Sequence, residues 1–264
     1  MLKPLEQIEN LAYGPRPLAS FASVLFGRVL HKVPAAAHRL FDGTGCECTV
    51  CGAQLKSFGH THRPDHLSCP ICGAIDRDRF HQLILQRRTG FYDDAPKSLL
   101  HIAPEPVLEP VFRATPQLRY VSGDLMRPNV THKVDICNMQ FEDNEFDFAF
   151  CSHVLEHVPD DSAAMREFAR VVKPTGKILF AFPQGTTPTT EDPTLTNRKE
   201  RIRRFGQIDH LRMYGPDVVE RFEQAGLAVT TLRPRDLCDP AEMIRLGFNV
   251  PVDLVAYLCE PAKH

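Results

Sequence analysis

The sequence predicts an α/β protein in which a doubly wound, mainly parallel sheet follows a small cysteine-rich module. From Ser98 onward, short apolar segments alternate with amphipathic ones, as expected when strands alternate with helices. The apolar segments are apolar throughout rather than at every second residue, so we expect helices to cover both faces of the sheet. Five of the nine cysteines lie between Cys46 and Cys72, which predicts a separate module ahead of the sheet.

Seven strands and three helices are expected in the α/β region. The strands are predicted at Ser98–Ala103, Leu118–Ser122, Val134–Cys137, Phe146–Cys151, Lys177–Phe182, Leu227–Leu232 and Leu254–Cys259. The helices are predicted at Val107–Arg113, Asp161–Val172 and Pro216–Ala225. On a sheet of this kind, ligands bind beyond the carboxyl ends of the strands.

The composition is that of an ordinary globular protein, with 43% hydrophobic and 24% charged residues. It excludes a mainly disordered, collagenous or coiled-coil chain. The net charge of -2 argues weakly against a dedicated nucleic-acid binder, which usually carries a basic excess. An odd number of cysteines, nine, fits poorly with a closed disulfide framework.

The N-terminal segment predicts neither a signal peptide nor a membrane span. It carries Glu6 and Glu9 and lacks the basic-then-apolar order of a leader. The apolar stretch Leu18–Leu30 is short and contains Arg28, so we expect a helix packed on the body of the protein, with an interfacial membrane helix as the alternative. We expect a cytoplasmic protein with reduced thiols and no membrane span.

The cysteine-rich segment contains two C-x-x-C pairs, each followed by glycine and separated by 17 residues. This spacing predicts a zinc ribbon whose four thiolates hold one Zn²⁺ ion. A closed four-thiolate site leaves no position for substrate, so the predicted role of zinc is structural. Cys46 and the loop histidines His60, His62 and His66 stay possible substitutes in that ligand set. The predicted ligands are Cys48, Cys51, Cys69 and Cys72.

Three motifs then resemble a known family. Phe141–Asp147, with the sequence FEDNEFD, is followed by FAFCSHVLEHV up to Val158, and Arg170–Leu179 reads RVVKPTGKIL. These segments resemble class I S-adenosylmethionine-dependent methyltransferases of the type 11 group, over about residues 98–260. The four-cysteine ribbon, with CGAIDRDRF and FGQIDHLRMYG, is also similar to a bacterial subgroup of zinc-ribbon methyltransferases.

The resemblance implies a Rossmann-like, seven-stranded methyltransferase fold and S-adenosylmethionine as cofactor. The chain then divides into a helical arm (1–40), a zinc-ribbon module (41–90) and a class I methyltransferase domain (91–264). The implied activity is methyl transfer to an oxygen or nitrogen of a small molecule. Two alternatives stay open: a zinc-ribbon RNA methyltransferase, which the net charge disfavours, and a non-catalytic binding module with a degenerate cofactor site.

The cofactor residues follow from the same resemblance. Asp124 matches the acidic residue that binds the ribose hydroxyls, and Asp135 the one facing the adenine amino group; a turn-forming and a strand-end aspartate are the alternatives. The usual glycine-rich first turn is replaced by His101–Pro106, which contains no glycine. Glu105 is expected to pair with the cofactor's ammonium group. The full set comprises His101, Ala103, Glu105, Asp124, Leu125, Asp135, Ile136, Cys151 and Ser152.

Catalytic and substrate residues are expected after the fourth and fifth strands. His153 and His210 are candidate general bases, because a neutral imidazole is poised near pH 7. His153, Glu156 and His157 form H-x-x-E-H, but the following Val158-Pro159 argues against the zinc-peptidase helix, and Glu156 and His157 are predicted to be structural.

The segment after strand five is expected to cover the active site. Its substrate candidates, besides Asp209 and His210, are Glu191, Asp192, Arg212 and Tyr214. The basic run Arg198–Arg204 is either an anion clamp or a solvated helix face, and Arg77 and Arg79 either contact an anionic substrate or pair locally with Asp76 and Asp78.

Overall fold

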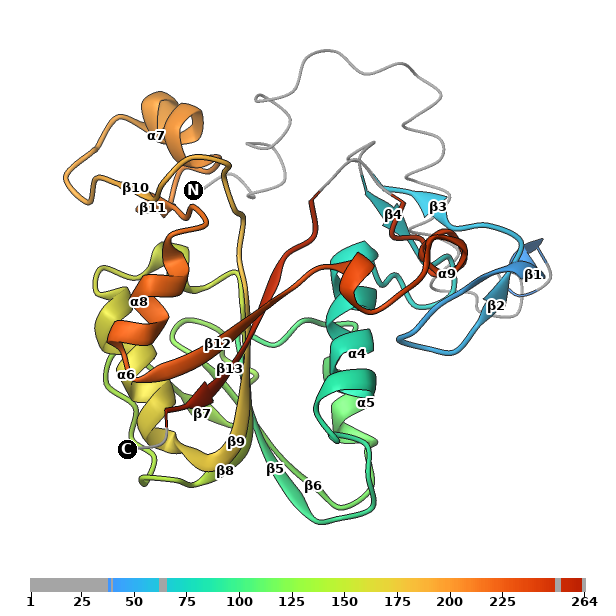
Figure 1. Cartoon of the computed structure of the whole chain (residues 1–264), viewed down its shortest axis with the longest axis horizontal. Helices are drawn as coiled ribbons and strands as arrows, with labels where there is room; N and C mark the ends of the chain where they lie inside the picture. Colours follow the sequence, from blue (N-terminus) through green and yellow to red (C-terminus); the bar gives the residue numbers. More distant parts are fainter. Residues whose placement is uncertain (1–37, 39, 62–65, 250–252, 263–264) are drawn as a thin grey trace.

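The computed structural model describes residues 38, 40–61, 66–249 and 253–262, and a seven-stranded sheet lies at its centre (Figure 1). The helical arm predicted for residues 1–40 lies outside the described residues apart from His38 and Leu40, as does His62 of the ribbon loop. Among the helices that the structure describes, none is long and apolar enough to span a membrane. All nine cysteines are described and form no disulfide.

The sheet has the strand order β12-β13-β9-β8-β5-β6-β7. Strand β13 is antiparallel to both of its neighbours, while β9, β8, β5, β6 and β7 are parallel. The chain leaves β5 in one direction and returns to its other side at β8, so the strand order reverses between these two strands. This reversal creates the crevice at which doubly wound sheets bind ligands. The strands are β5 (Lys97–Ile102), β6 (Leu118–Asp124), β7 (His132–Lys133), β8 (Phe146–Ser152), β9 (Val172–Ala181), β12 (Leu227–Leu232) and β13 (Ala256–Pro261).

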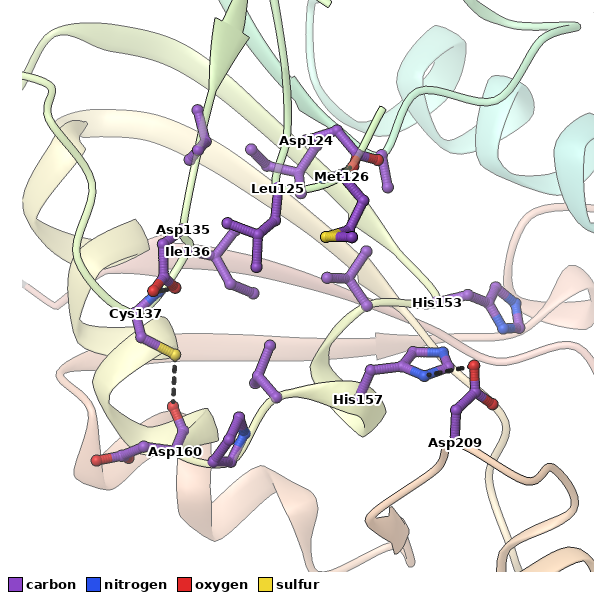
Figure 2. Close-up of a pocket in the computed structure, with 16 residues that line it drawn as sticks. Asp124, Leu125, Met126, Asp135, Ile136, Cys137, His153, His157, Asp160 and Asp209 are labelled. Atoms are coloured by element: carbon purple, nitrogen blue, oxygen red, sulfur yellow. Dashed lines mark hydrogen bonds and ion pairs between the residues drawn. The ribbon is translucent and has the colours of Figure 1, made fainter. Parts of the chain in front are cut away.

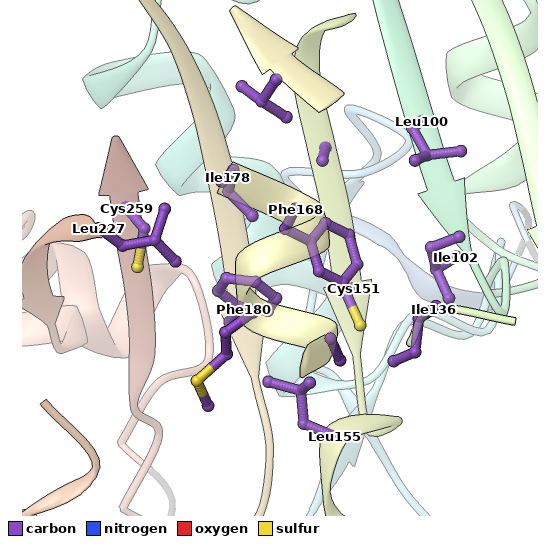
Figure 3. Close-up of a cluster of buried hydrophobic side chains, with 14 of the residues drawn as sticks. Leu100, Ile102, Ile136, Cys151, Leu155, Phe168, Ile178, Phe180, Leu227 and Cys259 are labelled. Carbon is purple, nitrogen blue, oxygen red and sulfur yellow. The ribbon is translucent and has the colours of Figure 1, made fainter. Parts of the chain in front are cut away.

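Helices cover both faces of the sheet, as predicted from its apolar strands. Figure 1 shows α6 (Asp161–Val171) and α8 (Val218–Gln224) on one side and α4 (Asp76–Arg88) and α5 (Glu109–Arg113) on the other. On the α6 side, Phe168 packs with side chains from several strands, among them Ile178 and Phe180 (Figure 3). Burial of this apolar surface on both faces is the main force that holds the layers together.

The third strand is not where the sequence placed it. Val134–Cys137 was predicted as a strand, but the edge strand is β7 and residues 134–137 form a turn. The carboxylate of Asp135 accepts a hydrogen bond from the Cys137 amide at 2.9 Å, and its carbonyl accepts one from the Asn138 amide at 3.1 Å. These local bonds bend the chain away from the sheet, as aspartate commonly does in turns. Val134 and Ile136 are buried all the same.

The cysteine-rich segment forms two small hairpins that pack against α4. They are β1 (Asp42–Glu47) with β2 (Gln54–Leu55), and β3 (Gly59–His60) with β4 (Leu67–Ser68). Apolar residues of these hairpins share one buried cluster with α4 and with the strands beneath it. The ribbon is therefore built onto one face of the larger domain.

A buried arginine joins the ribbon to the C-terminal part of the chain. Arg79 on α4 is fully buried, and its guanidinium lies 4.0 Å from the ring centroid of Phe58. It donates four hydrogen bonds of 2.9–3.1 Å, to the carbonyls of Leu67, Ala74, Leu246 and Gly247. Arg79 is therefore a structural residue and does not reach an anionic substrate.

The remaining elements lie outside the sheet. The segment after β9 contains β10 (Thr190–Glu191), α7 (Arg198–Phe205) and β11 (Arg212–Met213), which stand together at one end of the molecule in Figure 1. Two short elements, η2 (Pro234–Asp236) and α9 (Pro240–Arg245), precede β13, and α9 lies beside the ribbon in Figure 1. The short helix η1 (Leu155–His157) follows β8.

Candidate active site

A cavity of about 800 Å³ opens at the carboxyl ends of β5, β6 and β8, where the strand order reverses. Its size falls in the usual range for small-molecule and cofactor sites. Figure 2 shows side chains that follow these strands facing one another around the hollow. Of the predicted cofactor and catalytic residues, the cavity lining contains Ala103, Asp124, Leu125, Asp135, Ile136 and His153.

Asp124, the last residue of β6, is held at the cavity edge by its own loop. One carboxylate oxygen, Oδ1, accepts hydrogen bonds from the backbone amides of Met126 and Arg127 at 2.7 and 2.8 Å. These bonds fix the orientation of the carboxylate. A fixed carboxylate at a strand end suits the two hydroxyls of a ribose, because it can accept from two donors at once.

The turn after β7 places an acidic and an apolar side chain at the opposite edge. Asp135 is fixed by the Cys137 amide, and Ile136 is 3% exposed and lines the cavity (Figure 2). Leu125 and Met126 are 49% and 85% exposed at the same opening. An aromatic base fits between such apolar side chains, with a carboxylate beside it to accept from an exocyclic amino group.

The backbone conformation of Ala103 explains how the chain turns after β5 without a glycine. Its backbone has φ 48°, a left-handed conformation that glycine adopts without strain. The Ala103 amide donates to the Gly123 carbonyl at 2.8 Å, which ties the turn after β5 to β6. The chain thus turns at the end of β5 without glycine, and its small side chain lets a ligand approach the backbone. The residues around this cavity fit an adenosine-type cofactor.

Four other predicted cofactor residues, His101, Glu105, Cys151 and Ser152, are not part of the cavity lining. His101 is fully buried, and its ring lies 2.7 Å from the Glu105 carboxylate and 3.0 Å from the Tyr120 hydroxyl. Burial raises the pKa of Glu105, but the His101 hydrogen bond and charge outweigh it, so this pKa lies below its ordinary value. Glu105 is therefore already paired within the fold.

His153 stands between the main cavity and a smaller one. Its backbone, like that of Ala103, is left-handed, with φ 56°. The Arg77 guanidinium on α4 donates to His153 Nε2 at 3.1 Å, and His153 Nδ1 lies 3.4 Å from a Glu156 carboxylate oxygen. Because Nε2 accepts from Arg77, Nδ1 carries the proton and faces Glu156. Arg77 thus brings the helix that follows the ribbon to the candidate active site.

The smaller cavity has a volume of about 280 Å³ and is lined by residues from five parts of the chain. Besides His153, they include Arg77 and His81 of α4, His66 of the ribbon, the segment Ala181–Gln184 at the end of β9, and Asp253–Val255. His81 is 2% exposed, its Nδ1 is buried with no hydrogen-bond partner in the described structure, and burial lowers its pKa to about 3. A neutral imidazole therefore lies at this cavity with one nitrogen unused.

Four of the predicted substrate residues of the segment after β9 line neither cavity: Glu191, Asp192, Arg212 and Tyr214. Arg212 is 3% exposed and donates to the carbonyls of Leu155, Val158 and Pro159 at 2.6–3.1 Å. These carbonyls belong to η1 and the loop after it. The Arg212 side chain therefore anchors the loop that forms one wall of the main cavity.

Tyr214, Glu191 and Asp192 are also engaged within the fold. The Tyr214 hydroxyl donates to the Asp161 carboxylate at 2.7 Å, and Glu191 accepts from Arg212 at 3.1 Å. The Asp192 carboxylate pairs at 3.0 Å with Arg204, which belongs to the basic helix α7. Asp209, by contrast, lines the main cavity.

Several cavity residues were missed from the sequence. Met126, His157 and Asp160 line it, as does the chain segment 158–159. His157 was predicted to be structural, yet it projects into the cavity beside Asp209 (Figure 2). The signal that could have found these residues is their place directly after β8, because the carboxyl ends of parallel strands surround the ligand.

The four predicted zinc ligands meet in the ribbon. The sulfur atoms of Cys48, Cys51, Cys69 and Cys72 all lie within 4.8 Å of one another. Two of the Sγ–Sγ distances, Cys48–Cys72 and Cys51–Cys69, are 3.7 and 3.8 Å. A tetrahedral ion with Zn–S bonds of about 2.3 Å requires S–S distances of roughly 3.8 Å. The donor set and its spacing therefore fit zinc.

The two cysteine pairs have the same backbone geometry. Gly52 and Gly73, which follow the pairs, have φ 72° and 84°, a conformation that glycine adopts without strain. Their amides donate to the carbonyls of Cys48 and Cys69 at 2.8 and 2.9 Å. Cys46 is not in the metal cluster, and His66 lies 2.9 Å from the carboxylate of Asp76.

Comparison with known proteins agrees with this geometry. Residues 112–180 match the family model described as a methyltransferase domain. The match extends from α5 through β6 and β8 into β9, and so includes the ends of β6 and β8 at the main cavity but not the end of β5. The large domain has the class I methyltransferase fold. This assignment rests on the family match and on the strand order, in which the last strand, β13, lies antiparallel between β9 and β12.

Two curated proteins match parts of the chain. Over 55 residues the chain is 46% identical to demethylmenaquinone methyltransferase of Staphylococcus saprophyticus. This stretch covers 20% of this chain and 24% of that protein. Over 101 residues it is 30% identical to an uncharacterised 37.1 kDa protein in transposon TN4556 of Streptomyces fradiae, 38% of this chain and 29% of that one. The chain thus spans under a third of the length of these relatives.

Solved structures also resemble the chain at low identity. One comes from the complex of the Haloferax volcanii Trm112 methyltransferase activator with a methyltransferase, at 14% identity and TM-score 0.47, covering 71% of this chain and 90% of that one. Another is 1,6-didemethyltoxoflavin-N1-methyltransferase of Burkholderia thailandensis with bound 1,6-didemethyltoxoflavin and S-adenosylhomocysteine, at 14% identity and TM-score 0.46, covering 71% of this chain and 87% of that one.

Proposed function

We propose that the protein is an S-adenosylmethionine-dependent methyltransferase that acts on an oxygen or nitrogen of a small molecule. The observation that carries this proposal is the pair of cavities that meet at His153. The larger cavity has a fixed carboxylate at the end of β6 and an apolar wall after β7. The smaller cavity provides room for a compact methyl acceptor on the other side of the same histidine.

Asp124 is proposed to bind the ribose hydroxyls and Asp135 the adenine amino group. Ile136 and Leu125 are proposed to contact the adenine ring, and the left-handed turn at Ala103 lets the main chain approach the cofactor. When bound, S-adenosylmethionine supplies an electrophilic methyl group on its sulfonium. The protein contributes alignment of the acceptor and exclusion of water.

Of the two candidate bases, we favour His153. It lines both cavities, whereas His210 is 1% exposed and burial lowers its pKa. The Nε2 lone pair of His153 accepts a hydrogen bond from Arg77. To give its proton to Nε2, an acceptor hydroxyl or amine must therefore replace the guanidinium at this nitrogen. Arg77 is then free to pair with an anionic group of the acceptor.

The ribbon is proposed to hold one structural Zn²⁺ ion in its four-cysteine cluster. The S–S distances and the set of four thiol ligands support this assignment. Arg212, Tyr214 and Glu191 are proposed to position the wall of the cavity rather than to bind substrate. A cytoplasmic location stays a prediction.

Calorimetric titration with S-adenosylmethionine tests the cofactor assignment. Asp124→Ala is expected to weaken binding about 10- to 100-fold, because it removes hydrogen bonds to a charged group. Asp143→Asn, which changes an exposed carboxylate outside the cavity, serves as the control and is expected to bind as tightly as the unchanged protein. Equal affinity of the Asp124→Ala variant would overturn the site assignment, and no binding by the unchanged protein would overturn the enzyme proposal.

A further inference from the structure

A second group of metal-ligating side chains lies beside the main cavity, away from the cysteines. Glu156 and His157 come from η1, directly after β8, and His210 comes from the loop between α7 and β11. Each offers one ligand atom, and these three atoms all lie within 4.8 Å of one another. The rings of His157 and His210 are in edge-to-face contact, with centroids 4.7 Å apart.

The two buried members of this group have unused polar atoms. Glu156 and His210 are each 1% exposed. Nδ1 of His153 lies 3.4 Å from Oε1 of Glu156, longer than a good hydrogen bond, and within the described structure neither Oε2 of Glu156 nor Nε2 of His210 has a hydrogen-bond partner. Burial of a carboxylate without a close donor is costly, so such a group usually pairs with a cation or a ligand.

The proton on His210 is placed so that two acceptor atoms, Nε2 of His210 and Oε1 of Glu156, lie near each other. His210 Nδ1 lies 2.7 Å from the Phe205 carbonyl, so it carries the proton and Nε2 has a free lone pair. This Nε2 lies 3.9 Å from Oε1 of Glu156, too far for a hydrogen bond. Two ligands of one ion with bonds of about 2.1 Å are roughly 3.0–4.2 Å apart, depending on the angle between the bonds.

The surroundings of the group resemble the outer layer of a metal site. The Phe205 carbonyl fixes the ring of His210. The Asp209 carboxylate lies 3.5 Å from Nδ1 of His157, which leaves Nε2 as the nitrogen of His157 for an ion. Metal-binding histidines usually have their second nitrogen held by a carbonyl or a carboxylate in this way. In addition, the Leu211 amide donates to the Glu156 carbonyl at 2.9 Å and links the two segments.

We propose that Glu156, His157 and His210 bind one divalent first-row transition-metal ion at the edge of the main cavity. Two imidazoles and one carboxylate favour Mn²⁺, Fe²⁺, Co²⁺ or Zn²⁺ over Mg²⁺ or Ca²⁺, which prefer oxygen ligands. Three protein ligands leave coordination positions for water or substrate. His157 lines the cavity, so an ion bound to this group would lie at the cavity edge.

The ion would act on the methyl acceptor, a role that rests on the proposed methyltransferase function. An acceptor hydroxyl bound to a divalent ion would give its proton more readily to the base His153, and the ion would also hold the oxygen in place while the methyl group passes to it and S-adenosylhomocysteine leaves. This role selects an oxygen acceptor over a nitrogen one. Binding of the ion itself depends only on the three side chains and can be measured without cofactor or acceptor.

Metal binding to the full chain, with its cysteine cluster already zinc-loaded, tests the site. Calorimetric titration with Mn²⁺ and Co²⁺, followed by elemental analysis, should show one further ion per chain, whereas Mg²⁺ should bind far more weakly. Glu156→Gln and His210→Gln should weaken Mn²⁺ binding at least about 100-fold, and Asp209→Asn about 10- to 100-fold. His132→Gln changes an exposed histidine outside the group and should leave the affinity unchanged.

Because Glu156 and His210 are buried, His157→Gln provides a variant at a half-exposed position, and circular dichroism checks the fold of all variants. The proposal is overturned if the zinc-loaded protein takes up no further ion, or if folded His157→Gln and His210→Gln variants bind Mn²⁺ as tightly as the unchanged protein. Mg²⁺ binding as tight as Mn²⁺ binding would overturn the assigned class of metal. Loss of methyl transfer with metal binding intact would contradict the proposed function and leave the metal site standing.

Discussion

The Arg79 side chain joins the ribbon to the C-terminal segment, and replacing it with methionine is expected to destabilise the whole protein. Methionine keeps an apolar stem against Phe58 but leaves four carbonyls, at Leu67, Ala74, Leu246 and Gly247, without their donor. Each hydrogen bond to a charged donor contributes about 1.5–3 kcal/mol net. The loss is smaller than four times this value, because the variant also avoids burying a charge.

We expect the free energy of unfolding to fall by about 3–5 kcal/mol, the usual cost of breaking a buried charged network. The melting temperature should then fall by roughly 6–20 °C, at 2–4 °C per kcal/mol for a chain of this size. Urea unfolding followed by circular dichroism measures the free energy directly. Arg88→Met, at an exposed position at the end of the same helix, should change it by less than about 0.5 kcal/mol. A loss below about 1 kcal/mol for Arg79→Met would refute this account of the ribbon's attachment.

Three further outcomes follow from single features of the structure. Ala103→Val should destabilise the protein by about 1–3 kcal/mol in thermal unfolding, and Ala103→Gly by under about 1 kcal/mol, because φ 48° suits glycine and strains a β-branched residue; equal losses would contradict the strained turn. Removal of the ribbon metal with a chelator should expose all four cluster thiols to a thiol reagent; thiols that stay protected would show that the ribbon folds without metal. Burial raises the pKa of Asp78 from 3.8 to about 6, so the unfolded chain loses this proton first, and this group lowers the stability as the pH rises from about 4 to 6. Asp78→Asn should remove this contribution of about 2–3 kcal/mol, seen as the difference between the two proteins in urea unfolding at a series of pH values; an unchanged pH profile would contradict it.

The sheet could be predicted because its strands carry a strong local signal. Segments such as Ser98–Ala103 and Phe146–Cys151 are apolar throughout, and the observed strands β5 and β8 agree with them within a residue. The prediction of the third strand was wrong because Val134 and Ile136 give the sequence pattern of a strand, while the Asp135 side chain bends the chain into a turn. Apolar alternation alone cannot distinguish a strand from a turn whose two apolar side chains both reach the core.

The cysteine cluster could be predicted from the spacing of its pairs, since four ligands in two tight turns require no knowledge of the rest of the fold. The substrate candidates could not. Arg212 and Tyr214 are polar residues in a segment expected to cover the site, yet both are buried and hydrogen-bonded to the main chain or to Asp161. Sequence shows that a residue can donate a hydrogen bond, but only tertiary packing decides to which acceptor.

The left-handed turns at Ala103 and His153 were also beyond sequence reasoning. Both residues follow strands and face the cavity, and positive φ is uncommon for any residue other than glycine, although histidine adopts it more often than alanine. The resemblance directed attention to the missing glycines, while the structure shows alanine in the conformation that glycine would adopt. Strain of this kind is commonly found at ligand-binding turns.

A crystal structure of the protein with S-adenosylhomocysteine is the most direct test of the central claim. We predict that the ribose hydroxyls contact the Asp124 carboxylate, that the adenine lies beside Ile136, and that the sulfur points toward His153. Binding elsewhere on the protein, or an empty cavity at saturating ligand with Asp124 still bonded to its own loop, would contradict the account.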